Sequence, residues 1–507
     1  MTVSVATCSV QQLFEGQKIQ GNNGKQITGE LVIPEYQRPY CWQSQQIDSL
    51  LEDLDAHFRK HNELSYYLGS LILHHDEQKL KIIDGQQRIT TLALFSFLSQ
   101  QHQQLDLRFE SPRSQQQIKT NLNWLENHKA KWAKLINFER IQFSLVVTES
   151  EDDAYRFFET QNTGGVRLGG PDIIKAHHLR AVPKLHQSRF ALQWEGLGNL
   201  DNCVKFLLKG RYWQLLNMRD LAPHQQTKVV RDQIVSELGE QTTDGDDIAY
   251  GQVLRLTGIG GDVVQKAAQQ GYEIRQPLNA GVNTIRYLAY FQNLYQRYWV
   301  HPTLPHQEGY NRFVCWLKGL EGCGYLQGLY EACLMMYISQ FGEYQLELAA
   351  KKIFRVVYSR RVSNQKAVRE NSISSFVKDY PVLDWIALSY TPKQCFVFFD
   401  AFDLAVDPSN LDSDTNSVKK RFITEVSKHF QLALSPEQYA ASFANLLTCN
   451  ITKMTEKTWV QKLKRSCSHY ELLRQKIWAS LFHAISVLTF GVKKKLSSYL
   501  MIFVMLI

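Results

Sequence analysis

The ten residues from Ile82 to Thr91, IIDGQQRITT, contain the densest group of chemically capable side chains in this sequence. They place an acid, a glycine, two amides, an arginine and two hydroxyls between two apolar runs. A buried strand that turns at Asp84-Gly85 into a helix would point free backbone N–H groups at whatever lies over the turn. Arg88 adds a planar set of donors suited to a phosphate or a carboxylate. This pattern is typical of a phosphate-binding loop.

A structural interpretation of the same residues remains open. In that interpretation Asp84 caps a helix that starts at Gln86 or Gln87, and Arg88 pairs with Asp84 one turn away. The segment would then be an ordinary corner between a strand and a helix. The segment taken alone does not favour either interpretation.

A second polar cluster occupies Ile33–Trp42, IPEYQRPYCW, where two prolines restrict the backbone around Tyr36, Gln37 and Arg38. A restricted backbone loses little further entropy when a ligand binds. An aromatic ring, an amide and a guanidinium presented together suit a base or a sugar-phosphate. The alternative is a proline-bounded entry to the next helix; in both cases we expect Tyr40 and Trp42 to be core residues.

The third cluster runs from Phe157 to Lys175 and contains four glycines that would let a loop pass close to a ligand. We expect Asn162 to end one helix, Asp172 to cap the next, and Lys175 to lie one turn further on the same side. An ordinary connection between two helices would have the same appearance.

The elements that must position these clusters follow from apolar periodicity. We expect a helix over Gln45–Lys60 capped by Ser44, a hairpin of Tyr66–Leu73 with Leu80–Ile83, a strand over Ile141–Val147 and a helix over Asp152–Gln161. Beyond residue 190 the sequence is dominated by helical periodicity with many aromatic residues, which we interpret as core.

Composition narrows the class of protein. With 44% apolar and 21% charged residues the chain is expected to be folded, and its 507 residues suggest several domains. Nine cysteines without a C-x-x-C pair favour a reducing, cytoplasmic setting and predict no metal site. Ten basic and two acidic residues lie between Ile451 and Ile507. The last nine residues of this range are apolar, and we expect no stable membrane insertion for them.

The segments IPEYQRPYCW, YYLGSLIL, IIDGQQRITTL and FFETQNTGGVRLGGPDIIK together resemble the N-terminal domain of GmrSD-type (type IV) restriction proteins. The resemblance covers about residues 10–180. It implies an α+β fold: a ParB-like, sulfiredoxin-like domain with a small mixed sheet, followed by a mainly helical region. The expected domains are a ParB-like nucleotide-binding domain over 1–185, a helical domain over 186–450, and a basic and apolar helical tail over 451–507.

The resemblance implies a D-G-Q-x-R loop that binds and hydrolyses a nucleoside triphosphate with Mg²⁺. Carried over by motif, the catalytic candidates are Asp84, Gln87 and Arg88, and the nucleotide-binding candidates are Tyr36, Gln37, Arg38, Gly85, Gln86, Thr90, Asn162, Asp172 and Lys175. Asp84 or Gln87 could orient the attacking water or hold Mg²⁺, and which of the two does so stays open.

The expected function is that of an NTP-hydrolysing sensor subunit in a modification-dependent DNA restriction or phage-defence system. The HNH nuclease domain of many longer family members is not recognisable in this sequence, so we expect either that a partner subunit supplies that activity or that the C-terminal region has been truncated or replaced. The expected partners are therefore a nucleoside triphosphate, DNA with or without a modification, and an HNH nuclease, with oligomerisation left open. Two alternatives remain: a non-enzymatic DNA-binding adaptor whose loop holds a phosphate, and a ParB-like nuclease.

Overall fold

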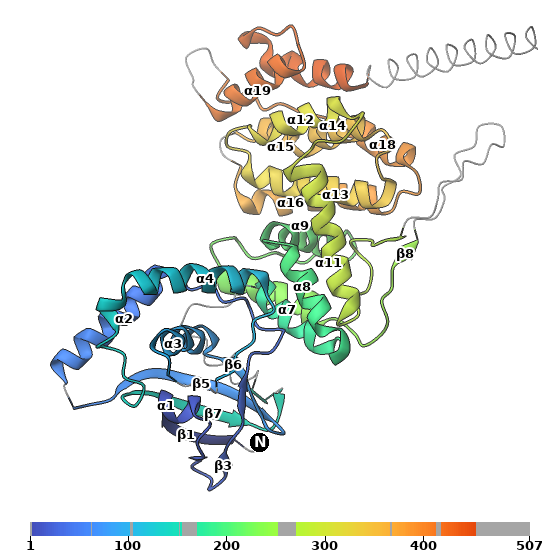
Figure 1. Cartoon of the computed structure of the whole chain (residues 1–507). Helices are drawn as coiled ribbons and strands as arrows, with labels where there is room; N and C mark the ends of the chain where they lie inside the picture. The colour runs from blue at the N-terminus through green and yellow to red at the C-terminus, as the bar shows by residue number, and fades with distance from the viewer. Residues whose placement is uncertain are drawn as a thin grey trace, which may run out of the picture. The chain divides into compact units, whose positions relative to one another are not determined.

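The computed structural model describes residues 3–61, 63–101, 105–151, 153–154, 170–251, 270–365, 368–411 and 417–452 (Figure 1). The helix expected over Asp152–Gln161, nearly all of the glycine-rich loop that follows it, and the tail after residue 452 lie outside the described residues.

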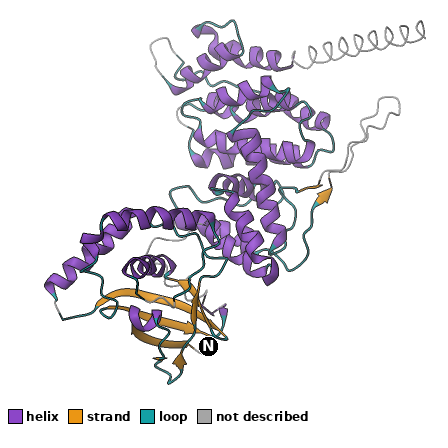
Figure 2. Cartoon of the chain, viewed as in Figure 1, coloured by secondary structure: helices purple, strands orange, loops and turns teal. Residues whose placement is uncertain are grey.

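A five-stranded mixed sheet forms the centre of the N-terminal part (Figure 2). Its strands are β1 (Val3–Ser9), β4 (Glu30–Val32), β5 (Tyr66–Asp76), β6 (Lys79–Asp84) and β7 (Ile141–Thr148). They are arranged in the order β1-β7-β5-β6-β4, with β1–β7 and β5–β6 antiparallel and β5–β7 and β4–β6 parallel. A mixed sheet followed by a helical region confirms the predicted α+β class.

The predicted hairpin and the predicted strand at residue 141 are both present. β5 and β6 pair antiparallel through Leu73 with Ile82 and Asp76 with Lys79, so the turn is shorter than expected and consists of residues 77–78. The apolar side chains Leu71, Ile82 and Ile83 are essentially inaccessible to solvent. The short turn delivers Asp84 to the end of a buried strand, which is where the candidate loop begins.

Helices cover the sheet, and Figure 1 shows α3 crossing one face with α4 beyond it. The helices of this part are α1 (Val10–Phe14), α2 (Ser44–Lys60), α3 (Gln86–Ser99), α4 (Pro112–Asn127) and α5 (Lys129–Trp132). α3 is buried on most sides. Its residues Ile89, Leu92 and Phe95 pack in the same hydrophobic core as the strands.

The prediction that Ser44 caps the second helix is wrong. α2 already includes Ser44, and Gln43 is its N-cap residue. The backbone N–H of Gln43 donates to Oε1 of Gln46 at 2.8 Å, which satisfies a free donor at this end and allows the helix to begin one residue earlier.

Among the described residues, the chain from residue 170 onwards is mainly helical, as predicted. Its helices are α7 (Gly170–Ala181), α8 (Gln187–Gly196), α9 (Asp201–Tyr212), α10 (Thr227–Val235), α11 (Val282–Tyr295), α12 (Glu308–Lys318), α13 (Gly324–Phe341), α14 (Leu346–Val357), α15 (Ser359–Ser363), α16 (Glu370–Asp379), α17 (Val382–Ala387), α18 (Pro392–Ala401) and α19 (Val418–His429). Residues 439–452 are also helical. The shorter elements are the strand pairs Ile19–Gln20 with Gln26–Ile27 and Tyr250–Gly251 with Gln270–Gly271, the 3-10 helices Lys184–His186 and Pro436–Gln438, and the π-helices Ser236–Glu240 and Gln296–Val300. Aromatic residues such as Phe206, Tyr287 and Tyr330 are fully buried, which confirms that these aromatics are core residues.

The chain divides into two compact units. The first comprises residues 1–315, 325–344 and 369–395, and the second comprises 316–324, 345–368 and 396–507. Residue 185, the predicted end of the N-terminal domain, lies within the first unit. In the second unit Trp316 stacks on His429 with ring centroids 3.8 Å apart, and the Arg355 guanidinium donates to the carbonyls of Phe399 and Phe402. Among the residues described, no helix has the length and apolar character needed to cross a membrane.

Candidate functional site

The corner between β6 and α3 depends on a glycine. Gly85 has φ +97°, and a Cβ atom at this position would lie 2.1 Å from Cδ2 of Leu71. The α3 helix begins directly afterwards at Gln86, as predicted, and Ile89 N–H donates to the Gly85 carbonyl at 3.0 Å. By helix geometry the backbone N–H groups of its first turn have no partner within the helix. The corner therefore presents the positive end of α3 beside Asp84.

Arg88 is held against the sheet. Its Nη1 donates to the Leu68 carbonyl at 3.1 Å, and its Nη2 lies 3.4 Å from Oδ2 of Asp84. A Cβ atom at Gly69 would lie 2.4 Å from Nη1, so the guanidinium packs directly on the β5 backbone. The pairing of Arg88 with Asp84 in the structural interpretation is therefore present, although Gly85 rather than Asp84 is the N-cap residue and no side chain caps this end.

Gln87 joins the corner to the proline segment, which we define as residues Pro34–Trp42. Its buried side-chain oxygen accepts from the backbone N–H groups of Cys41 at 2.9 Å and Trp42 at 3.3 Å, and its Nε2 donates to the Pro39 carbonyl at 3.2 Å. Gln37 adds a further connection, because its Nε2 donates to the Ile83 carbonyl at 2.9 Å. The first two polar clusters of the sequence are thus bound to each other by side chain to backbone hydrogen bonds.

Within the proline segment, Tyr36 and Arg38 have different environments. Tyr36 is buried, and its hydroxyl donates to Oε1 of Glu151. The Arg38 guanidinium is only half-buried, and among the described residues it has no hydrogen bond or ion pair. Tyr40 is buried, and Trp42 packs against the same core, as predicted. Arg38 is therefore the cation of the segment that a ligand can reach.

Lys175 of α7 connects the third cluster to the proline segment. The Lys175 ammonium is almost inaccessible; it donates to the Gln37 carbonyl at 2.8 Å and lies 3.3 Å from Oε1 of Glu195 in α8. Burial lowers the pKa of Lys175, whereas the Glu195 carboxylate acts in the opposite direction. Because Gln37 and Lys175 are 138 residues apart, this contact brings all three clusters together.

The other two predicted site residues of the third cluster are Asp172 and Asn162. Asp172 lies in the first turn of α7 near Lys175. The prediction that it caps this helix is wrong, because the helix begins at Gly170 and Pro171, a residue favoured in the first turn, is already helical. Asn162 lies outside the described residues.

Glu35 is a candidate that the sequence reasoning missed. Burial, followed by the carboxyl group of Glu110 to which it is hydrogen-bonded, raises the pKa of Glu35 to about 7, and the Lys175 ammonium acts in the opposite direction. Glu195 faces the same group of charges, and its Oε2 is buried without a hydrogen-bond partner. The proline segment contains Glu35, but no spacing in the sequence connects it to Glu110 or Glu195.

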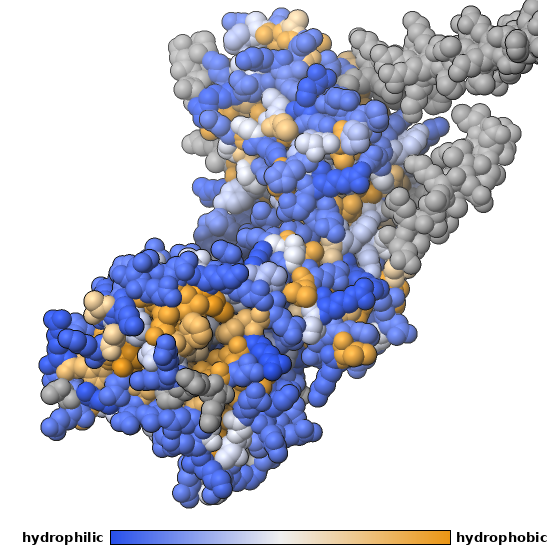
Figure 3. Space-filling view, in the orientation of Figure 1, coloured by the Kyte–Doolittle hydropathy of each residue, from blue (hydrophilic) through white to orange (hydrophobic). Residues whose placement is uncertain are grey.

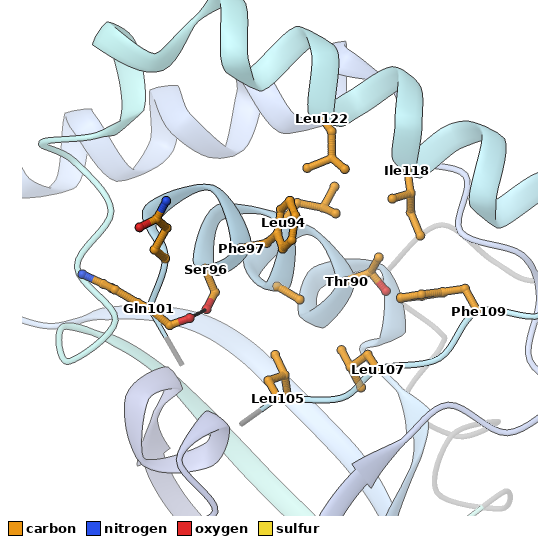
Figure 4. Close-up of a pocket in the computed structure, with 12 residues that line it drawn as sticks. Thr90, Leu94, Ser96, Phe97, Gln101, Leu105, Leu107, Phe109, Ile118 and Leu122 are labelled. Carbon is orange, nitrogen blue, oxygen red and sulfur yellow. Dashed lines mark hydrogen bonds between the residues drawn. The ribbon is translucent and has the colours of Figure 1, made fainter. Parts of the chain in front are cut away.

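Gln86 and Thr90 occupy one side of α3, one helical turn apart. Both side chains are buried, and neither Oε1 of Gln86 nor Oγ1 of Thr90 has a hydrogen-bond partner. Thr90 also lines a cavity of about 530 Å³ between α3 and α4 (Figure 4). Buried polar atoms of this kind are uncommon in folded proteins and call for an explanation.

In a comparison with known protein families, residues 10–179 match the family described as GmrSD restriction endonuclease, N-terminal domain. These residues form a GmrSD-type N-terminal domain. Residues 186–415 match a family of unknown function (DUF7834). No curated protein matches the chain.

The GmrSD-type domain contains every described residue of the predicted site. The contacts given above join Gln37, Asp84, Gly85, Gln87, Arg88 and Lys175. Tyr36 and Arg38 lie on the same proline segment, Gln86 and Thr90 lie in α3, and Asp172 lies in the first turn of α7 near Lys175. Among the residues described, no group of three or more His, Cys, Asp or Glu side chains could hold a metal ion.

Proposed function

We propose that the GmrSD-type domain binds a nucleoside triphosphate between the proline segment and the first turn of α3, and hydrolyses it. The chain would then act as the sensor component of a modification-dependent restriction or phage-defence system. The restriction context is supported by the family match, which indicates a component of such a system. Modified DNA and an HNH nuclease subunit are proposed as partners on the same basis.

The observation that carries the proposal is the state of Arg38. Arg38 is half-buried on a rigid segment and has no hydrogen bond or ion pair with the described residues, and its guanidinium is suited to bidentate contacts with a phosphate. Gln37 and Gln87 connect that segment to the start of α3, whose free N–H groups also favour an anion. The segment that contains Arg38 is therefore hydrogen-bonded to the corner at the start of α3, which supports a shared phosphate site.

Hydrolysis of the γ-phosphoryl group needs charge stabilisation and a positioned water more than covalent catalysis. The water oxygen bonds to the γ-phosphorus, the bond between that phosphorus and the bridging oxygen breaks, and the water gives up a proton. A carboxyl group with a pKa of about 7 accepts a proton most effectively near neutral pH, and Glu35 is the group of that kind on the proline segment.

Mg²⁺ in such sites is bound by one or two carboxylates together with phosphate oxygens. Asp84 fits this requirement, because it stands at the end of β6 with its side chain 31% exposed. Mg²⁺ would lower the charge on the phosphates when bound. We assign Gln87 and Arg88 to positioning, because their polar atoms are bonded to backbone carbonyls and N–H groups of the domain.

Phosphate release from ATP, GTP, CTP and UTP by the full-length protein with Mg²⁺ tests the proposal. We expect Arg38→Gln to lower turnover by at least about 100-fold, the effect of removing one charge-stabilising donor. Arg59→Gln is the matched control, because Arg59 is exposed on α2 and pairs only with Asp55 among the described residues. Turnover that survives Arg38→Gln, or a wild-type protein that releases no phosphate, would contradict the assignment of an NTPase.

A second function is favoured by the same contacts. Because Gln87 and Arg88 of the D-G-Q-x-R loop are engaged with the backbone, the domain could bind a nucleotide or a DNA phosphate without cleaving it. Binding that depends on Arg38 but is accompanied by no phosphate release would identify the protein as an adaptor.

A further inference from the structure

The cavity beside α3 is lined by α3, by α4 and by the segment that connects them. Its wall includes Thr90, Phe97, Leu105, Leu107, Phe109 and Leu122, and none of the described residues that line it is charged. Phe97 is 70% exposed, so an aromatic ring stands where the cavity meets solvent. Figure 3 shows hydrophobic side chains gathered on the surface between α4 and the sheet. The volume of about 530 Å³ is within the range of small-molecule sites.

One polar atom distinguishes one side of this cavity. The Thr90 hydroxyl is buried on the cavity wall, and among the described residues its oxygen has no hydrogen-bond partner, whereas the neighbouring Thr91 hydroxyl donates to the Gln87 carbonyl at 2.9 Å. A buried polar atom without a partner costs about 1–3 kcal/mol, so a ligand that supplies a hydrogen bond to the Thr90 oxygen would gain this free energy.

We propose that this cavity holds the base of the nucleoside triphosphate, with the Thr90 hydroxyl bonded to the polar edge of the base and the Phe109 ring against its face. This inference rests on the proposed function and adds to it the subsite that distinguishes one nucleotide from another. A nucleobase is flat and uncharged, with hydrogen-bonding groups on its edge, and aromatic side chains stack on its face. An aliphatic ligand would leave the Thr90 oxygen without a partner, and a charged ligand would find no opposite charge.

The position of the cavity suits a molecule that also reaches the phosphate-binding elements. Thr90 lies four residues after Gln86, the first residue of α3, and this spacing corresponds to about 6 Å along the helix axis. Phe109 is followed directly by Glu110, whose carboxyl group is hydrogen-bonded to Glu35 of the proline segment. The end of the cavity at Thr90 and Phe109 is therefore adjacent to the proposed phosphate site.

Calorimetric titration of the full-length protein with the four nucleoside triphosphates and with inorganic tripolyphosphate separates the base from the phosphates. We expect Thr90→Val to weaken the tightest nucleotide by about 3- to 10-fold, the range for one neutral hydrogen bond, and to leave tripolyphosphate unchanged. Ala93→Phe, which fills the cavity from α3, should weaken all four nucleotides by more than tenfold and again leave tripolyphosphate unchanged. Arg38→Gln should weaken both kinds of ligand.

The matched control is Thr120→Val, because Thr120 is exposed on α4 and its hydroxyl donates to the Gln116 carbonyl. Thermal melting provides a second measurement: Thr90→Val should be as stable as the wild type or more stable, because it removes a buried hydroxyl that has no partner. Nucleotide binding that Arg38→Gln weakens, but that Thr90→Val and Ala93→Phe leave unchanged, would overturn the base subsite and leave the proposed function in place. A wild-type protein that binds neither nucleotides nor tripolyphosphate would overturn both.

Discussion

Replacing Gln87 by leucine tests whether this side chain positions the site or takes part in its chemistry. The substitution keeps an unbranched stem at Cβ and removes all three hydrogen bonds to the proline segment. The N–H groups of Cys41 and Trp42 and the carbonyl of Pro39 would each lose a partner. The proline segment would then be connected to the corner by Gln37 and by its apolar contacts.

The size of the effect follows from these three bonds. A backbone group left unsatisfied costs about 1–3 kcal/mol when buried, but Cys41 is exposed and Trp42 is only partly buried, so water can replace part of the loss. We therefore expect the proline segment to be destabilised by about 2–4 kcal/mol rather than by the full sum. At about 1.4 kcal/mol for each factor of ten, amide exchange in residues 40–42 should become about 30- to 1000-fold faster.

Hydrogen exchange followed by mass spectrometry on the full-length protein measures this directly, with peptides from α4 as an internal reference. Gln116→Leu is the matched control, because Gln116 is exposed on α4 and a surface change of this kind is worth about 0.5 kcal/mol or less. If Gln87→Leu abolished phosphate release while exchange in residues 40–42 stayed at the wild-type rate, Gln87 would act on the bound nucleotide and the positioning role would be refuted.

Three further predictions concern Glu35, Gly85 and His178. Because the pKa of Glu35 is raised to about 7, its ionisation destabilises the folded state as pH rises from about 4.5 to 7, so Glu35→Gln should raise the melting temperature at pH 8 and change it little at pH 5. A gain of equal size at both pH values would contradict this. Gly85→Ala should lower the free energy of unfolding in urea by about 2–4 kcal/mol, because Gly85 has a positive φ and an added Cβ would clash with Leu71. Gly24→Ala should lower it by only about 1–2 kcal/mol, because Gly24 has a positive φ but open space around it. Equal losses in the two variants would show that the clash with Leu71 contributes nothing. Burial lowers the pKa of His178 to about 3, and both nitrogens of its neutral ring are hydrogen-bonded to backbone groups. The neutral ring therefore stabilises the folded state fully above pH 6.5, and this stabilisation decreases as pH falls. We expect the free energy of unfolding to fall by about 2 kcal/mol by pH 5, and this fall to be absent in His178→Gln.

Much of the candidate loop could be predicted from the sequence because its determinants are local. The apolar run before Asp84, the turn at Gly85 and the apolar periodicity after it lie within about fifteen residues, and each depends on neighbours in the chain. The antiparallel hairpin of β5 and β6 follows in the same way from two apolar segments joined by a short polar turn. The α+β class, the start of α3 and the burial of Tyr40 were accordingly correct.

Helix ends were predicted less well, because they depend on individual hydrogen bonds. The Gln43 N–H donates to the Gln46 side chain, and α2 therefore begins at Ser44, the expected cap residue, instead of at Gln45. Pro171 is tolerated in the first turn of α7, so Asp172 is inside that helix.

The sequence by itself determined that three polar clusters stand in an order typical of a GmrSD-type domain. Only the tertiary structure decided what each side chain can do there, because its partners are distant in the chain. The amide of Gln87 is bonded to backbone 46 residues earlier, and the ammonium of Lys175 to a carbonyl 138 residues earlier. Burial by such long-range contacts also sets the pKa of Glu35, and the tertiary structure engages Arg88 while giving Arg38 no hydrogen bond or ion pair with the described residues. Hydrogen bonding and desolvation act over a few ångströms in space, whatever the separation along the chain.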